Sequence, residues 1–91
     1  MVNPARERMR YLKSEILKGR KLLDRLNHQI VQDIQANKTY SGLFIKGIGA
    51  TLPRIQYVKK VLERTYGNSY LVQITSSPNG CQIMLRLKDN K

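Results

Sequence analysis

Apolar residues recur at alternating spacings of three and four along the first part of the chain, with one gap. The members of this stripe are Met9, Leu12, Ile16, Leu23, Leu26 and Ile30. Such spacing is typical of a helix, and of a coiled coil when several repeats follow one another. The gap falls at Gly19, and glycine is a poor helix former. The pattern therefore leaves two interpretations of residues 9–36 open.

The two interpretations differ in whether Gly19 lies within a helix or in a turn. The first is a single long helix from about residue 5 to residue 36. The second is a short strand near residues 11–17, a turn at residues 18–20, and a helix over the rest. The regular stripe favours the first, whereas the glycine favours the second. Both place a helix at residues 21–36, with an apolar face formed by Leu22, Leu23, Leu26, Ile30, Val31 and Ile34.

Two later segments predict β structure. Residues 40–46 contain a continuous apolar run at 43–45, which is typical of a central strand covered on at least one face. Residues 70–75 and 81–88 each alternate between apolar and polar positions. The Pro-Asn-Gly sequence between them has the composition of a tight turn, so the two segments predict a β-hairpin.

A second helix is expected between the predicted central strand and the hairpin. A glycine turn at residues 47–51 precedes it, and Thr51 is its predicted N-cap. Pro53 is acceptable because a proline fits the first turn of a helix. The helix runs to about Tyr66, and the Gly-Asn pair that follows ends it.

Charge is the strongest compositional signal. The 91 residues suffice for a single domain with one modest core, which we place at residues 9–91 after a polar, basic lead-in at residues 1–8. The chain has 17 Lys and Arg against 6 Asp and Glu, for a formal net charge of +11. Such a charge favours polyanionic partners, of which nucleic acid is the commonest and an anionic membrane surface the next.

The residue inventory argues against several other classes of protein. Cys81 is the only cysteine, so no disulfide forms within the chain, and the sequence has neither an apolar signal region nor a membrane-spanning apolar run. We therefore expect an intracellular protein of the cytoplasm, the nucleoid or nucleus, or an organelle matrix. His28 is equally isolated and the carboxylates are scattered, so we expect no metal site and no acid–base pair. We expect no enzymatic activity, cofactor, small-molecule substrate or membrane association.

The junction between the predicted central strand and the second helix carries a family resemblance. It consists of an apolar strand at residues 43–45, a small glycine-bearing turn at residues 47–49, and a helix with an early basic residue, Arg54. This arrangement resembles the Alba family, particularly the Alba-like subunits of ribonuclease P and MRP. The Lys-Gly-Arg-Lys run at residues 18–21 falls where that family has a Gly-Lys-Lys turn after its first strand. The resemblance spans roughly residues 11–88.

The resemblance implies an α/β (α+β) fold of βαβαββ order, with a mixed four-stranded sheet and two helices on one face. The C-terminal domain of bacterial translation initiation factor three has a similar layout. This order favours a strand at residues 11–17. The family usually dimerises and binds DNA or RNA. The contacts to nucleic acid that the resemblance implies are Lys18, Arg20, Lys21, Lys46 and Arg54.

Two departures from the chromatin-type members of the family favour RNA over DNA. Ile48 and Ala50 stand where those proteins carry arginines, and Ile48 is similar to the ribonuclease P type. The predicted hairpin turn is also too short for a long basic arm. These differences shift the expectation from DNA packaging toward RNA binding.

Further candidates come from the backbone, the remaining cations and the tyrosines. Gly47 and Gly49 expose backbone N–H groups at a helix start, where phosphate binds well, although they also suit any tight turn. Arg54 opposes the helix dipole, so a ligand or plain solvation could explain it. A secondary basic surface is expected at Arg6, Arg8, Arg10, Lys59, Lys60 and Arg64. The first three, with Lys13, could form a flexible arm or clamp RNA, and the last three could simply be a solvated helix face. The tyrosines that could stack on bases, or simply be half-buried, are Tyr40, Tyr57, Tyr66 and Tyr70.

The sequence therefore predicts a non-enzymatic protein that binds the phosphate backbone of nucleic acid, RNA rather than DNA. We expect a homodimer, or a subunit of a ribonucleoprotein or chromatin particle. One alternative is a structural ribosomal or mitoribosomal protein, which should have a long N-terminal helix or arm. The other is a coiled-coil interaction protein that pairs through residues 9–34.

Overall fold

A long N-terminal helix dominates the shape of the molecule. The computed structural model describes residues 3–88, and its first element is the 32-residue helix α1 (Pro4–Gln35). The Asn3 side-chain oxygen accepts a hydrogen bond from the backbone N–H of Ala5 at 3.0 Å, which caps the start of the helix. The single-helix interpretation is thus confirmed. Residues 11–17 form no strand, and the predicted lead-in is already helical from Pro4 onward.

The sheet has three antiparallel strands in the order β1-β3-β2. They are β1 (Tyr40–Lys46), β2 (Tyr70–Ser77) and β3 (Gly80–Leu87). The predicted strand and hairpin are confirmed. β1, however, is an edge strand rather than a central one, and β3 lies in the middle. The mixed four-stranded sheet of the Alba layout is not confirmed, because the residues expected to supply its first strand are helical.

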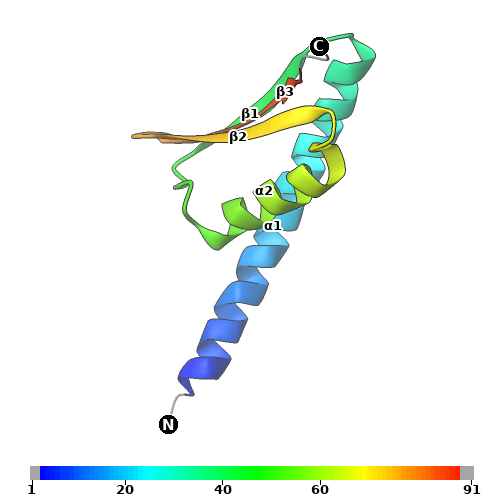
Figure 1. Ribbon diagram of the computed structural model, residues 1–91. Coiled ribbons are helices and arrows are strands. Elements are labelled where there is room, and N and C mark those ends of the chain that lie inside the picture. The colour runs from blue at the N-terminus through cyan, green and yellow to red at the C-terminus, as the bar shows by residue number, and fades with distance from the viewer. Residues whose placement is uncertain (1–2, 89–91) are drawn as a thin grey trace.

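The second helix, α2 (Pro53–Tyr66), joins β1 to the hairpin. Its C-terminus falls at Gly67, as predicted. The predicted N-cap is wrong: Leu52, rather than Thr51, occupies the cap position, and its side chain makes no capping hydrogen bond. Both helices lie on the same side of the sheet (Figure 1), so the fold is a two-layer α+β arrangement.

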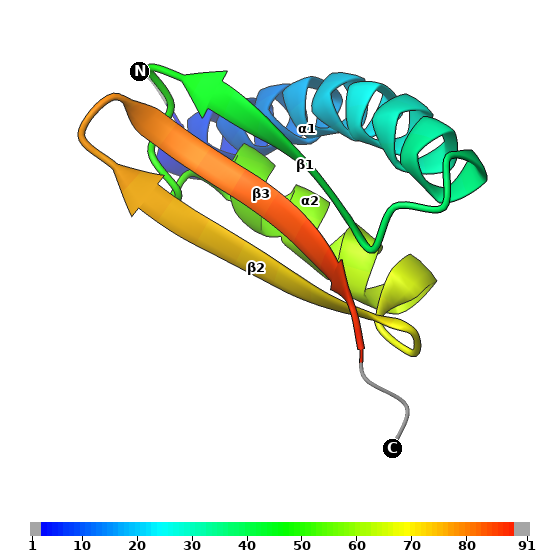
Figure 2. The same ribbon diagram turned by 90° about the horizontal axis from the view of Figure 1, so that it is seen from above.

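The core fills the space between the two helices and the sheet. Its buried members are Leu22, Leu26, Ile30, Ile45, Ile55, Val58, Leu62, Cys81, Ile83 and Leu85. Alternation along each strand sends every second side chain into this core and leaves the opposite face of the sheet open. Seen from above, this open face looks toward the viewer, with α1 and α2 behind it (Figure 2).

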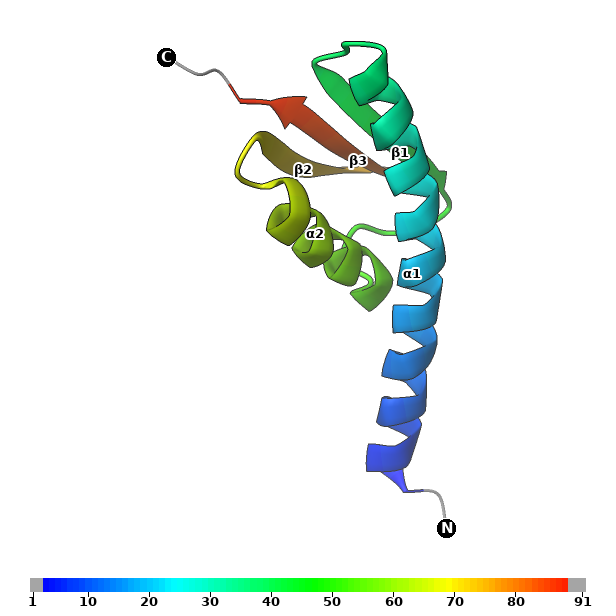
Figure 3. The same cartoon turned by 90° about the vertical axis from the view of Figure 1, so that its right-hand side faces the viewer.

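The N-terminal part of α1 extends beyond the rest of the domain. None of the residues 4–14 is buried. Figures 1 and 3 both show this end of the helix running clear of the sheet and of α2. The Cα extents of 58 × 27 × 23 Å reflect this projection. We call residues 4–14 the projecting segment.

Candidate nucleic-acid interface

A buried ion pair marks the point where α1 enters the domain. Glu15 is 1% exposed, and its Oε2 accepts a hydrogen bond from Arg54 Nη2 at 2.8 Å and another from Arg54 Nε at 3.1 Å. Its Oε1 also accepts from the backbone N–H of Arg54 at 3.4 Å. Glu15 therefore supplies, from α1, the capping carboxylate that Leu52 cannot give to α2.

The Glu15 carboxylate is held in its ionised form. The side-chain hydrogen bonds from Arg54 keep the pKa of Glu15 below its usual value of 4.5, against the opposing effect of its burial. The backbone N–H of Arg54 and the positive charges of Arg54 and Lys18 act in the same direction. The N-terminus of α2 is thus already occupied by an anion from the protein itself, the Glu15 carboxylate.

Gly19 lies one turn further along α1, where the two helices touch. A Cβ atom at this position would lie 2.7 Å from Cδ1 of Tyr57 and 3.1 Å from the backbone oxygen of Arg54. The absence of a side chain therefore lets α1 and α2 approach closely. The glycine that suggested a turn is a helix-packing residue.

These contacts change what the predicted junction offers to a ligand. The Arg54 guanidinium is already hydrogen-bonded to Glu15. The backbone N–H of Arg54, in the first turn of α2, could hold a phosphate but donates to the same carboxylate. Gly47 adopts a φ of 76°, and its N–H donates to the Asn79 carbonyl at 2.8 Å. Gly49 has open space around it. A phosphate role for this turn stays a prediction, with fewer free donors than the sequence indicated.

The N-terminal part of α1 presents a row of cations on one side. Arg6, Arg10, Lys13 and Arg20 follow one another at spacings of four, three and seven, which places them on a single helix face. We call these four residues the cationic stripe. All four are exposed, and among the described residues none of them forms a salt bridge. Lys21 adds charge on a neighbouring face of α1, whereas Arg8 and Lys18 lie on other faces of the helix.

Apolar side chains run beside the cationic stripe. Met9, Ile16 and Leu17 are exposed, and they share two shallow hollows with the cations. One hollow of about 330 Å³ is lined by Arg6, Met9, Arg10 and Lys13. The next, also of about 330 Å³, is lined by Lys13, Ile16, Leu17 and Arg20. This side of α1 is therefore both strongly basic and partly apolar.

The remaining predicted cations lie on other elements. Lys59, Lys60 and Arg64 belong to α2, and Lys59 Nζ lies 3.7 Å from Glu63 Oε1 in an exposed pair. Lys46 ends β1. In Figure 1 the connection that follows β1 bends out on the side away from α1. The structure thus brings together the predicted cations of α1 and separates them from Lys46 and the α2 set.

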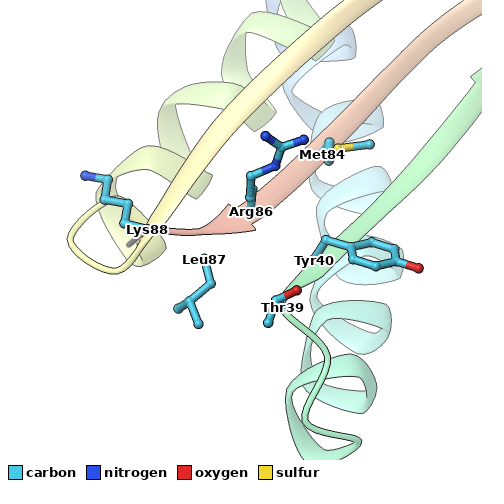
Figure 4. Close-up of a pocket in the computed structure, with 6 residues that line it drawn as sticks. All are labelled: Thr39, Tyr40, Met84, Arg86, Leu87 and Lys88. Carbon is cyan, nitrogen blue, oxygen red and sulfur yellow. The ribbon is translucent and has the colours of Figure 1, made fainter. Parts of the chain in front are cut away.

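Of the residues on the open face of the sheet, the sequence named Tyr40 as one that could stack on bases, but it missed Phe44 and Arg86. Tyr40 is 60% exposed and Phe44 is 48% exposed, and both side chains point away from the helices. Arg86 pairs with Tyr40 across the strands, and Met84 lies beside them. A hollow of about 430 Å³ lies here (Figure 4), lined by Thr39, Tyr40, Met84, Arg86, Leu87 and Lys88. The continuous apolar run at 43–45 did not show which of its members face the helices and which face outward.

The groups considered for catalysis or metal binding are placed apart. Cys81 is fully buried in the core, and burial raises the pKa of its thiol. His28 is exposed on α1, where its Nε2 lies 3.1 Å from Gln32 Nε2. Within residues 3–88, no three His, Cys, Asp or Glu side chains gather where they could hold a metal ion, and no helix is long and apolar enough to cross a membrane.

Comparison of the chain with protein-family models, with curated proteins and with solved structures found no match.

Proposed function

We propose that this protein is a non-enzymatic nucleic-acid-binding protein that grips the phosphate backbone and favours RNA over DNA. The observation that carries the proposal is the cationic stripe. Four cations lie along one face of α1 without a salt bridge among the described residues, and most of them stand on a segment that packs against nothing in the domain. Free cations in a row suit a row of phosphates.

The physical basis is the release of counterions. Each Lys or Arg that neutralises a phosphate frees condensed cations, so affinity falls as salt rises. From Arg6 to Arg20 the stripe spans about 21 Å of helix, enough to follow several phosphates. With about five contacts, the slope of log affinity against log salt should be roughly −4 on a duplex.

The projecting segment also suggests how the protein is used. A long N-terminal helix is the feature expected of a ribosomal or other ribonucleoprotein component. Residues 4–14 bury nothing in their own domain, so they are available to a larger particle. We therefore favour a subunit of an intracellular ribonucleoprotein, with a stand-alone homodimer as the other form.

The Alba resemblance remains part of this proposal. From Tyr40 to Leu87 the order is strand, helix, strand, strand, which matches the last four elements of the βαβαββ layout. The chain differs at its start, where α1 takes the place of the first strand and of the turn after it. Any contacts that Lys18, Arg20 and Lys21 make with nucleic acid would therefore come from a helix, not from a turn.

The test compares two variants with the same change in charge. Replacing Arg6, Arg10 and Lys13 by Gln should reduce the salt slope by about 2 to 3 on a duplex. The control replaces Lys59, Lys60 and Arg64 by Gln, and its slope should stay near that of the wild type. The affinities of both variants for RNA and for DNA are measured by fluorescence anisotropy over a range of salt concentrations. An equal reduction of the salt slope in the two variants, or no nucleic-acid binding by the wild type at low salt, would refute the proposal.

A second candidate is the coiled-coil interaction protein, which the exposed apolar residues beside the stripe favour. Met9, Leu12 and Ile16 are accessible, but Leu26 and Ile30 of the same series are buried in the core. A partner helix could reach only the first half of the series, which is shorter than a stable coiled coil needs. Light scattering on a Met9→Gln, Leu12→Gln, Ile16→Gln variant tests this candidate, because loss of oligomers with unchanged RNA affinity would support it.

A further inference from the structure

Two aromatic rings stand on the open face of the sheet with nothing packed over them. Ser41 and Ile45 are buried on the helix side of β1, so the alternate residues Tyr40 and Phe44 point the other way. Both rings are about half exposed, at 60% and 48%. An exposed aromatic pair on one strand provides flat surfaces on which bases can stack.

The spacing of the two rings favours an extended single strand. Four residues of strand separate their Cα atoms by about 13 Å. Bases in a helical strand follow one another every ~3.4 Å, so neighbouring bases of one helical stack cannot occupy both rings. Gly42 lies between them and adds no side chain. A single strand with its bases splayed apart fits this spacing, whereas a duplex does not.

The hydrogen-bonding pattern brings a cation next to the first ring. The N–H of Leu87 donates to the Thr39 carbonyl at 2.8 Å, so the next pair, Tyr40 and Arg86, is a non-hydrogen-bonded one with its side chains close together. The close-up of the hollow shows Tyr40 from β1 and Arg86 and Met84 from β3 around it (Figure 4). A guanidinium in this position can reach a phosphate while the ring holds the base.

The rest of the face has the same chemical character. Its other outward positions on the three strands are Gly42, Lys46, Leu71, Gln73, Thr75, Gln82 and Met84. The described strand residues on this face include no carboxylate, and the amide and hydroxyl groups can bond to base edges. Lys88 lies at the rim of the hollow, with its Nζ donating to the Gly67 carbonyl at 2.6 Å. Charge complementarity thus favours a polyanion over a neutral or basic surface, which would leave Arg86 and Lys46 uncompensated.

We propose that the open face of the sheet binds single-stranded RNA, with bases stacked on Tyr40 and Phe44 and a phosphate held by Arg86. The inference rests on the proposed function and adds to it a substrate class and a second surface. The cationic stripe supplies attraction to any polynucleotide, and the sheet face selects unpaired bases. RNA bound across the sheet contacts different residues from RNA bound along α1.

The test removes the rings and keeps an apolar face. Tyr40→Leu with Phe44→Leu abolishes stacking but retains the hydrophobic contact that a protein partner would need. Binding of a short, mixed-sequence single-stranded RNA should weaken by at least about fivefold for each ring. The same RNA annealed to its complement should bind as it does to the wild type. The matched control is Tyr11→Leu, an exposed tyrosine of α1, which should change neither affinity.

Two further measurements keep the outcome clear. The aromatic swap Tyr40→Phe with Phe44→Tyr should restore single-strand affinity, which separates stacking from a fold defect. A 2-aminopurine base in the RNA should be quenched by the wild type and by the swap, and not by the leucine variant. The salt slope should be the same in all of these proteins, because no cation is removed.

The results that overturn the inference differ from those that overturn the proposed function. Unchanged single-strand affinity in the leucine variant rules out the sheet face, even if the cationic stripe proves correct. A change of oligomeric state without a change of RNA affinity would assign the face to a second copy of the chain instead. If the wild type binds no polynucleotide at low salt, both proposals fail.

Discussion

The two halves of α1 have similar sequences and different surroundings. In both, apolar residues return every three or four positions, from Met9 in the first half to Ile30 in the second. The second half buries its members in the core, as at Leu26, whereas the first half leaves Met9 and Leu12 exposed. The boundary is Glu15, which pairs with the first turn of α2. Beyond that point there is no element for the helix to pack against.

The comparison shows that an amphipathic pattern indicates helix but does not say what covers its apolar side. The balance of charge also differs between the two halves. Residues 4–14 carry four cations against a single carboxylate, Glu7, whereas the part of α1 after Glu15 carries four cations against Asp24 and the buried Asp33, which pairs with Lys38 at 3.4 Å. We infer that the first half of α1 binds a partner, whereas the second half packs in the core of the domain.

The largest effect should come from truncating matched apolar residues in the two halves. Leu26→Ala should lower the free energy of unfolding by about 2–5 kcal/mol, because it opens a cavity in a fully buried part of the core. Met9→Ala should change it by less than about 0.5 kcal/mol, because Met9 is 58% exposed. Urea denaturation followed by circular dichroism measures both. Similar losses in the two variants would contradict the division of α1.

A smaller effect is expected at Gly19, one helical turn after the boundary. Gly19→Ala improves helix propensity by about 1 kcal/mol, yet its Cβ would press on Tyr57 and on the backbone of α2. Overpacking costs typically 1–3 kcal/mol, so the net change should be a modest destabilisation. Gly49→Ala is the control, because open space surrounds that glycine. Thermal melts of the two variants show whether each change raises or lowers the melting temperature. A Gly19→Ala variant that melts at a higher temperature than the wild type would refute the close approach of α1 and α2.

The sequence predicted the elements better than it predicted their environment. Strand 40–46, the second helix and the hairpin are recovered because their signals are local: a continuous apolar run, a proline in a first turn, and alternation on both sides of a Pro-Asn-Gly turn. The role of Gly19 is not local, since it depends on Tyr57, which lies far along the chain. The same is true of Arg54, whose partner Glu15 precedes it by 39 residues. Such long-range pairs leave no pattern in a single sequence.

The candidate site was also predicted only in part, because some of its features are local in the sequence and others depend on the fold. The cations of α1 are visible as a composition bias, so Arg6, Arg10 and Arg20 were among the candidates. Their alignment into one stripe required knowing that the segment is a single helix. The exposure of Tyr40 and Phe44 required knowing that their side chains lie on the face of the sheet opposite the two helices, whereas Ser41 and Ile45 lie on the covered face. The continuous apolar run at 43–45 does not show which of its members face the helices.

Acid should act on the boundary between the halves through Glu15. Its pKa in the folded protein lies below the usual 4.5, so the ionised carboxylate stabilises the fold above that pH. This contribution is lost as the pH falls below 4.5 and through the lowered pKa. Glu15→Gln should therefore be less stable than the wild type at pH 7, and the difference should shrink as the pH falls toward 3. The gap between the two melting temperatures, recorded across this range, measures the effect.

The Glu15 prediction has an internal control in the exposed pair of α2. Lys59 and Glu63 lie in solvent at i and i+4, where a pair contributes about 0.3–0.5 kcal/mol. Glu63→Gln should therefore change stability less than Glu15→Gln at pH 7. A Glu15→Gln variant that matched Glu63→Gln at every pH would show that the buried pair is not a structural link between α1 and α2.

A small effect on stability, relative to the number of residues lost, should come from removing most of the projecting segment altogether. A protein that begins at Ser14 lacks residues 1–13 and keeps Glu15 and Gly19, and Ser14 can serve as a new N-cap. Because residues 4–14 bury nothing, we expect the free energy of unfolding to change by less than about 1 kcal/mol. RNA binding should weaken at the same time, since Arg6, Arg8, Arg10 and Lys13 are gone, with a shallower salt slope. A truncated protein that unfolds would place the first half of α1 in the domain, and one that binds RNA with the wild-type slope would remove the projecting segment from the interface.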